Sequence, residues 1–196
     1  MDNFVRDVDL IQRQKKYYLL DYIRSRAEGD RQGQFLNTGI YGTSNTKWDM
    51  KIRPLSISTW EREVFAVVSS NTSNKVQVGW LTTQEHGYNY RAINCSCSFS
   101  AGLGTSDCVI IGSSSITTNY PFYIFAQNDR GTQGCDTYMR LYYAKIWNGG
   151  KLVRDYIPAQ RIKDGVVGMY DKVSQTLFVN GSSNAGFVAG NIIGKF

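Results

Sequence analysis

The sequence predicts an all-β domain, a sandwich or barrel of antiparallel strands, with a short helical arm at its N-terminus. Runs rich in β-branched and aromatic residues recur at short, fairly regular intervals and are separated by turn residues. Two of these runs flank Asn148-Gly149-Gly150, whose residues tolerate the positive φ angles of a tight hairpin turn. The chain has 196 residues, 42% of them hydrophobic, with 19 Gly and 13 Tyr, which suits one folded β domain rather than a disordered chain.

The first segment of the chain has a different pattern. Phe4, Val8 and Ile11 fall at positions i, i+4 and i+7 among charged residues, which indicates a short amphipathic helix. An isolated helix of about fifteen residues is marginal in water, so this one should pack on something. The surface it covers could belong to its own domain or to a partner protein. We therefore expect an arm at 1–16 and a β domain at 17–196.

Strands are expected in order along the rest of the chain. In the segment 47–53, Trp48, Met50 and Ile52 alternate with charged residues, the pattern of a half-buried strand. The run 64–68 is more uniformly apolar and should be central in its sheet. The other expected strands are 17–23, 34–40, 76–81, 88–93, 108–111, 122–126, 138–147 and 151–158.

Charge and cysteine usage limit the classes of partner. The net charge is +6, but Lys and Arg are scattered, apart from the group at 13–16, so we expect no nucleic-acid partner. No apolar run approaches the roughly 20 residues of a membrane helix, so no membrane insertion is expected. The opening residues do not have the pattern of a signal peptide. The four cysteines lack the Cys-x-x-Cys pairs of a zinc site and are expected to be free thiols.

No catalytic signature is recognisable, so the sequence predicts a protein that is not an enzyme. Glu61 and Glu63 would share a face in a strand, but no further acid follows them, as a glycosidase cluster on such a fold requires. His86 is the only histidine, and nothing around it resembles a nucleophile motif. A solvated loop histidine is the simpler interpretation.

Two parts of the sequence resemble a known group of domains. The segment 34–40 follows a Gln-aromatic-x-x-Thr-Gly-apolar pattern, and it comes after a first strand at 19–23. The closing third contributes the segments 125–128, 141–147, 152–158 and 168–171. Together they resemble the concanavalin A-like, LamG-like jelly-roll domains found in proteins of gut bacteria and their phages, many of them lectin-like or head and tail proteins. The resemblance covers about residues 17–196 and implies a two-sheet antiparallel jelly-roll sandwich. The arm has no counterpart in it.

The resemblance also implies two kinds of candidate binding site, one for calcium and one for a sugar. Some lectin-like jelly rolls hold calcium, and Asp129 and Asp136 could contribute oxygen ligands. The simpler interpretation of each is a turn residue that bonds its own backbone. A sugar could dock on Trp80, Tyr88 and Tyr90, which flank a polar loop that contains His86. The alternative for these aromatic residues is burial in the core of the sandwich.

Two functions follow as expectations. The first is a non-enzymatic phage virion protein, a head decoration, head fibre or tail-associated component, located in the virion. Its arm, through Phe4, Val8 and Ile11, would bind other virion proteins or further copies of the chain, and its jelly roll could bind host glycans. The alternative is a free carbohydrate-binding lectin or adhesin module of a secreted bacterial protein. No cofactor is expected apart from the calcium that the resemblance allows.

Overall fold

A computed structural model describes most of the chain and is all-β in that part. The described residues are 15–26, 33–43, 45–55, 62–68, 75–80, 95–100, 103–106, 109–112, 118–134, 137–183 and 185–196, with backbone pairing alone for the strands between 62 and 112. No helix occurs among them. The helix expected at 2–16, with Phe4, Val8 and Ile11, lies outside the described residues except for its last two positions, which are not helical.

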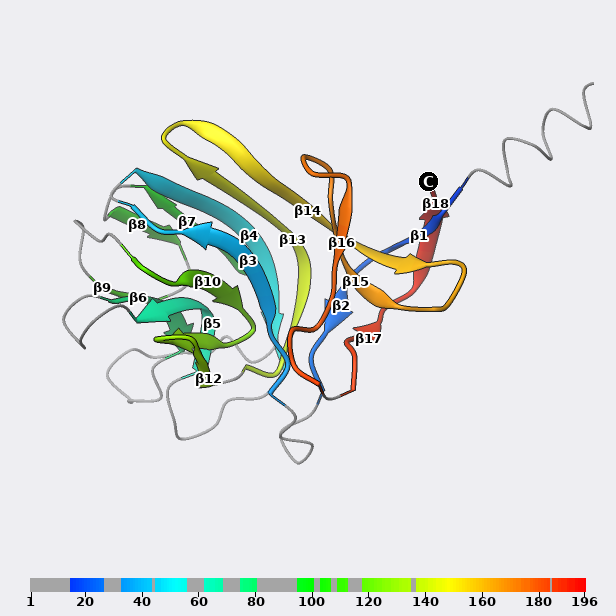
Figure 1. The fold of residues 1–196 in the computed structure, drawn as a ribbon, viewed down its shortest axis with the longest axis horizontal. Coiled ribbons are helices and arrows are strands. Elements are labelled where there is room, and N and C mark those ends of the chain that lie inside the picture. Colours follow the sequence, from blue (N-terminus) through cyan, green and yellow to red (C-terminus); the bar gives the residue numbers. More distant parts are fainter. Residues whose placement is uncertain are drawn as a thin grey trace, which may run out of the picture.

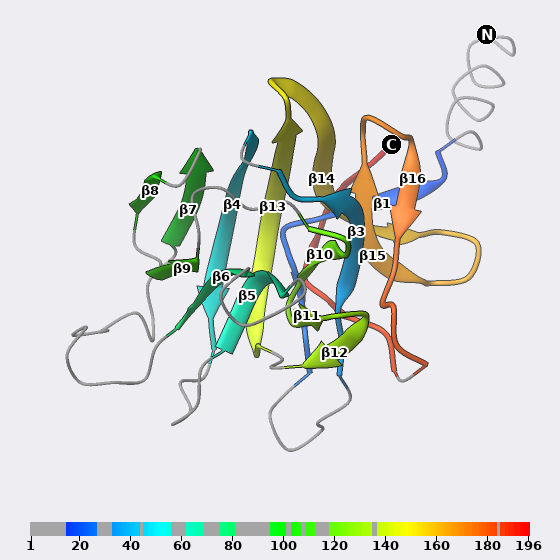
Figure 2. The same cartoon turned by 60° about the vertical axis from the view of Figure 1, so that its left-hand side comes forward.

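The described strands form two sheets, shown in Figure 1 and, turned by 60°, in Figure 2. The first sheet contains β1 (Tyr17–Leu20), β2 (Ile23–Arg24), β4 (Thr46–Pro54), β7 (Cys95–Ser100), β8 (Leu103–Ser106), β13 (Met139–Asn148), β14 (Lys151–Arg161), β15 (Val167–Asp171), β16 (Thr176–Phe178), β17 (Val188–Ala189) and β18 (Ile192–Lys195). The second sheet contains β3 (Leu36–Tyr41), β5 (Arg62–Val68), β6 (Lys75–Trp80), β9 (Val109–Gly112), β10 (Pro121–Ile124), β11 (Gln127–Asp129) and β12 (Thr132–Gly134).

The core of the protein lies between the two sheets. The Trp48 ring of β4 lies 6.0 Å from the Phe122 ring of β10, so the sheets contact each other through large apolar side chains. Burying each such side chain contributes about 1.5–3 kcal/mol relative to leaving it exposed. The alternation expected in β4 is confirmed, because Trp48, Met50 and Ile52 are all buried. The all-β prediction is therefore confirmed, with two packed sheets as the arrangement.

The hairpin expected at Asn148-Gly149-Gly150 is also confirmed. β13 and β14 pair antiparallel, with Asn148 opposite Lys151, so Gly149 and Gly150 form a two-residue loop. Their φ angles are 58° and 81°, values that glycine adopts without steric cost. A Cβ at either position would meet no atom within 4 Å, so the backbone conformation alone requires glycine there.

The prediction of a strand at 122–126 is wrong for its last two residues. β10 stops at Ile124 because Phe125 has a φ of 73°, which no strand residue adopts, and the chain reverses there. Phe125 is fully buried and lies against Phe187, with ring centroids 4.9 Å apart. After the reversal, β11 pairs with β5 in the parallel sense, whereas the sequence led us to expect antiparallel pairs throughout.

The single strand expected at 17–23 is two strands, β1 and β2, separated by a bend at Asp21. Farther from the hairpin loop, β13 and β14 no longer pair with each other. Instead β14 pairs with β1 and β13 pairs with β2. On their other edges, β1 and β2 pair with β18 and β17. The N-terminal strands are thus held between the hairpin and the C-terminal strands, as Figure 1 shows.

Candidate functional site

The residues suggested for sugar binding lie largely outside the described part of the chain. Trp80 is the last residue of β6, whose backbone alone is described. His86, Tyr88 and Tyr90 fall in the undescribed segment 81–94. The sugar site built on these four residues stays a prediction.

Asp129 is described, and its carboxylate forms an ion pair with the side chain of the next residue, Arg130. Arg130 donates its Nε–H to Asp129 Oδ1 at 2.8 Å, and this hydrogen bond raises the pKa of Arg130. The turn residue that bonds the backbone here is Asn128, whose Oδ1 accepts from the Gly131 amide at 2.8 Å, rather than Asp129. Asp136 is not described, and the described residues hold no group of three or more potential His, Cys, Asp or Glu ligands. The calcium site stays a prediction.

The first described residues of the chain lie beside Phe196 at one end of the first sheet. The Phe196 carbonyl accepts hydrogen bonds from the amides of Lys16 and Tyr17, at 2.9 and 3.1 Å. On the opposite edge of β1, the Ile162 amide donates to the Lys16 carbonyl at 2.9 Å. Lys16 is thus fixed from both sides, so the chain N-terminal to it leaves from a rigid point of the sheet.

Three aromatic rings reinforce this end of the sheet. Tyr17 stacks on Phe196, with centroids 5.4 Å apart, and lies 4.8 Å from Tyr170. Tyr170 and Phe196 meet edge to face at 5.0 Å, which closes a three-ring cluster across β15, β1 and the end of β18. Aromatic pairs in such geometries contribute about 0.5–1.5 kcal/mol each beyond their buried area.

Apolar side chains are exposed on the segments that flank β1. We call the terminal surface the group formed by Ile162, Ile192, Ile193 and Phe196. Ile193 is 62% exposed, Ile192 is 55% exposed, and Ile162 and Phe196 are 38% and 36% exposed. Single exposed apolar residues need no explanation, but four on neighbouring segments form a candidate contact surface.

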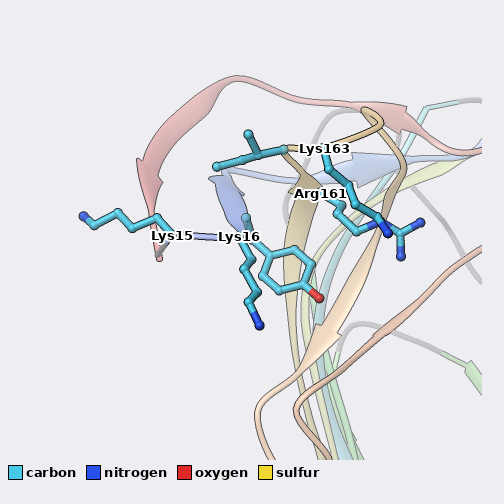
Figure 3. Close-up of a pocket in the computed structure, with 6 residues that line it drawn as sticks. Lys15, Lys16, Arg161 and Lys163 are labelled. Atoms are coloured by element: carbon cyan, nitrogen blue, oxygen red, sulfur yellow. The ribbon is translucent and has the colours of Figure 1, made fainter. Parts of the chain in front are cut away.

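A pocket of about 540 Å³ lies beside the root of the arm (Figure 3). Its cationic residues are Lys15, Lys16, Arg161 and Lys163, and Tyr17 and Ile162 complete the lining. Arg161 pairs with Asp164 at 2.8 Å. The hydrogen bond between these two side chains raises the pKa of Arg161 and lowers the pKa of Asp164.

The cations of this pocket do not converge on one point. In Figure 3 the Lys15 side chain extends away from the others, and the Lys16 ammonium lies on a different side from Arg161 and Lys163. A compact anion site needs donors aimed at a common position, which this pocket does not offer. Its described lining also contains no acid–base pair or nucleophile placed for catalysis. The arrangement suits a contact surface with an open, basic hollow.

The edge strand β18 is unsuited to pairing with a further strand. Leu19 pairs with Gly194 and Leu20 with Ile192, so Ile193 is an extra residue that bulges from the ladder. Lys195 lies nearby on the same strand, above the Tyr18 ring at 5.0 Å. Bulges and lysines are the usual means by which edge strands avoid pairing with other chains. A partner would therefore contact side chains here rather than extend the sheet.

Sequence reasoning missed the terminal surface. Ile162 and Phe196 flank Lys16 only because strands distant in sequence pair around β1, and no local pattern marks that pairing. The only available signal was the apolar run at the C-terminal end, Ile192-Ile193 and Phe196, with just Gly194 and Lys195 between.

Comparison with known proteins adds no relative. No family model, curated protein or solved structure matches the chain. In the described part, no helix has the length and apolar character needed to span a bilayer.

Proposed function

We propose that the protein is a non-enzymatic structural component of a phage virion, a head decoration, head fibre or tail-associated protein. Its two sheets would form a concanavalin A-like jelly roll that is displayed outward. The terminal surface and the arm at 2–16 together would attach it to further copies of the chain and to other virion proteins. The observation that carries the proposal is the exposure of Ile162 and Phe196, which are hydrogen-bonded to Lys16 at the root of the arm, and of Ile193 farther along β18.

The rigid root supports an attachment role. An arm that attaches the protein to a partner must join the domain at a well-ordered point, whereas chain ends are usually poorly ordered. Here Lys16 and Tyr17 are hydrogen-bonded to Phe196 on one side, and Lys16 to Ile162 on the other. If the arm is helical, as its sequence predicts, Phe4, Val8 and Ile11 would give it an apolar stripe of its own. Two apolar surfaces that adjoin could bury each other between copies.

Self-association is the form of attachment to which we commit. Most soluble assemblies are symmetric homo-oligomers, in which one surface patch is repeated in every subunit. An arm that follows directly from an apolar surface can contact the same surface of a neighbour. The basic residues Lys15, Lys16 and Lys163 lie at its border, as charged residues do at the rim of an interface.

A carbohydrate-binding module is the second candidate function. The observation that favours it is a group of arginine and tyrosine side chains on the outer face of the first sheet, described below. The two functions are compatible, since a displayed virion protein can also bind host glycans. They differ in what the arm is for, because a free lectin does not need it.

Removal of residues 1–14 is expected to convert defined oligomers of the full chain into monomers. Deletion at this point leaves every described strand pairing in place, because Lys16 is the first of the described residues that is hydrogen-bonded into the sheet. The measurement is the mass in solution of the full chain and of 15–196, by light scattering or sedimentation. Equal thermal unfolding of the two proteins is the control for folding. If the full chain and 15–196 are both monomers, the proposed role of the arm is contradicted.

A further inference from the structure

We propose that Arg24, Arg140 and Arg53, on the outer face of the first sheet, bind the carboxylate or sulfate groups of an acidic glycan. The proposal names a class of ligand for the sandwich. It rests on the proposed function, because that function displays the sandwich outward. It involves a different surface from the one that holds copies together. The two proposals can therefore fail separately.

The three arginines form a row across adjacent strands. Arg140 of β13 lies directly opposite Arg24 of β2 on one side and opposite Arg53 of β4 on the other. Directly opposite residues share a face of the sheet, and neighbouring strands are about 4.8 Å apart. The adjacent residues Leu141 and Ile52 are fully buried in the core, so the arginines lie on the outer face.

The row has no anionic partner in the described part of the chain. Among the described residues, Arg24 donates only to the Ser25 carbonyl and the Tyr138 hydroxyl, both at 3.4 Å. The Nε atoms of Arg53 and Arg140 are buried and bond to nothing among the described residues. The described carboxylates have other partners, and these carboxylates are Asp21, Asp49, Asp129, Asp155, Asp164 and Asp171.

Such a row is unfavourable for the protein by itself. Like charges directly opposite each other in a sheet destabilise it, and a buried donor without an acceptor adds a further cost. Local arrangements that reduce stability are found mostly where a protein binds something. An anion that bridges neighbouring guanidinium groups would remove the first of these costs, the repulsion between like charges.

Tyrosine rings hold two of the arginines, Arg24 and Arg140, in place. The Arg140 guanidinium lies 4.3 Å from the Tyr22 ring centroid, and the Arg24 guanidinium lies 5.9 Å from that of Tyr138. Tyr142 contacts Tyr22 edge to face at 5.9 Å. Stacking restricts the guanidinium planes, and a fixed planar fork binds a carboxylate or sulfate through two parallel hydrogen bonds. The partly exposed rings also offer apolar contact to the C–H groups of a sugar.

The neighbouring residues favour an acidic glycan over a nucleic acid. Further along the same face, Lys145 of β13 lies between Asp155 of β14 and Asp49 of β4. A phosphate backbone that extended along the strands from the arginine row would meet these two carboxylates. Nucleic-acid sites typically need a continuous basic stripe instead. A glycan with spaced acidic groups needs only the row itself.

The test is calorimetric titration of the full chain with two acidic probes, a sulfated heparin oligosaccharide and a carboxylated oligogalacturonate. Neutral dextran serves as the blank, at constant ionic strength. We expect Arg140→Gln to weaken binding of at least one acidic probe about tenfold or more, because hydrogen bonds to a charged group are lost. The double variant Arg53→Gln/Arg140→Gln should show no binding.

The matched control is Arg130→Gln, which removes the same charge from an exposed turn on the other sheet. It should leave affinity within about twofold of the unchanged protein, since Arg130 pairs with the exposed Asp129. Arg140→Gln should keep or raise the melting temperature, whereas an arginine with a purely structural role would lower it on removal.

Three results would overturn the inference. The first is that the unchanged protein binds neither acidic probe. The second is that Arg130→Gln weakens binding as much as Arg140→Gln, which would mean that net charge alone attracts the probe. The third is that a single-stranded oligonucleotide binds the row more tightly than both glycans. None of these results affects the mass measurement proposed for the arm.

Discussion

Replacement of Asp171 by alanine is expected to destabilise the protein by about 3–5 kcal/mol, the range for removing one member of a buried charged pair. Asp171 is fully buried at the end of β15, where its carboxylate accepts hydrogen bonds from the Asp155 and Val173 amides. It also accepts from the Ser174 hydroxyl at 2.7 Å and lies 3.7 Å from Arg154 Nη1. Alanine would leave these donors, and the partly buried Arg154, without their acceptor.

Urea unfolding of the purified variant measures this loss. Asp171→Asn should be less harmful than Asp171→Ala, because the amide oxygen keeps one acceptor at the same position. Asp164→Ala is the matched control, since Asp164 binds Arg161 at an exposed turn, and its unfolding midpoint should barely move. An unfolding midpoint for Asp171→Ala equal to that of the control would show that the buried carboxylate is not a structural element.

Replacement of Ile23 by alanine should cost about 2–5 kcal/mol, the range for truncating a buried aliphatic side chain. Ile23 is fully buried in β2, between β13 and β17. The size of the effect tests whether the N-terminal strands are part of the core rather than a loose extension. Thermal and urea unfolding of the variant give the free-energy change.

The control for Ile23→Ala is Val173→Ala, which truncates another β-branched aliphatic residue at a position that is 45% exposed. Its effect should lie within about 0.5 kcal/mol, as for most surface substitutions. If the two variants lose equal stability, the described burial of β2 is wrong.

Local patterns in the sequence were sufficient to predict the elements that depend on local backbone geometry. Trp48, Met50 and Ile52 identify a buried face because side chains alternate with period two along a strand. Gly149 and Gly150 identify a hairpin because few residues besides glycine adopt the required φ angles. Phe125 could not be predicted in this way, since its positive φ is imposed by tertiary packing against residues such as Phe187.

Both candidate surfaces depend on pairings between distant segments, which a single sequence does not reveal. Arg24 and Arg140 become neighbours through the register of β2 and β13, and a shift of one residue would place one of them on the core face. Lys16 and Phe196 meet through pairing of the two ends of the described chain. The alternation of charged and apolar residues in β4 did place Arg53 on the outer face, but not beside other arginines.

The most direct measurement of the central claim is the mass in solution of the full chain that carries Ile162→Asp and Ile193→Asp. Both side chains are exposed, so the double variant should fold normally, and two buried carboxylates would oppose any contact between copies at the terminal surface. The control is Tyr41→Asp with Val173→Asp, which adds the same charge at exposed apolar positions elsewhere. We predict oligomers for the unchanged chain and the control, and monomers for the Ile162/Ile193 variant. An unchanged chain that is itself monomeric, or a variant that keeps the oligomeric mass, would contradict attachment through this surface.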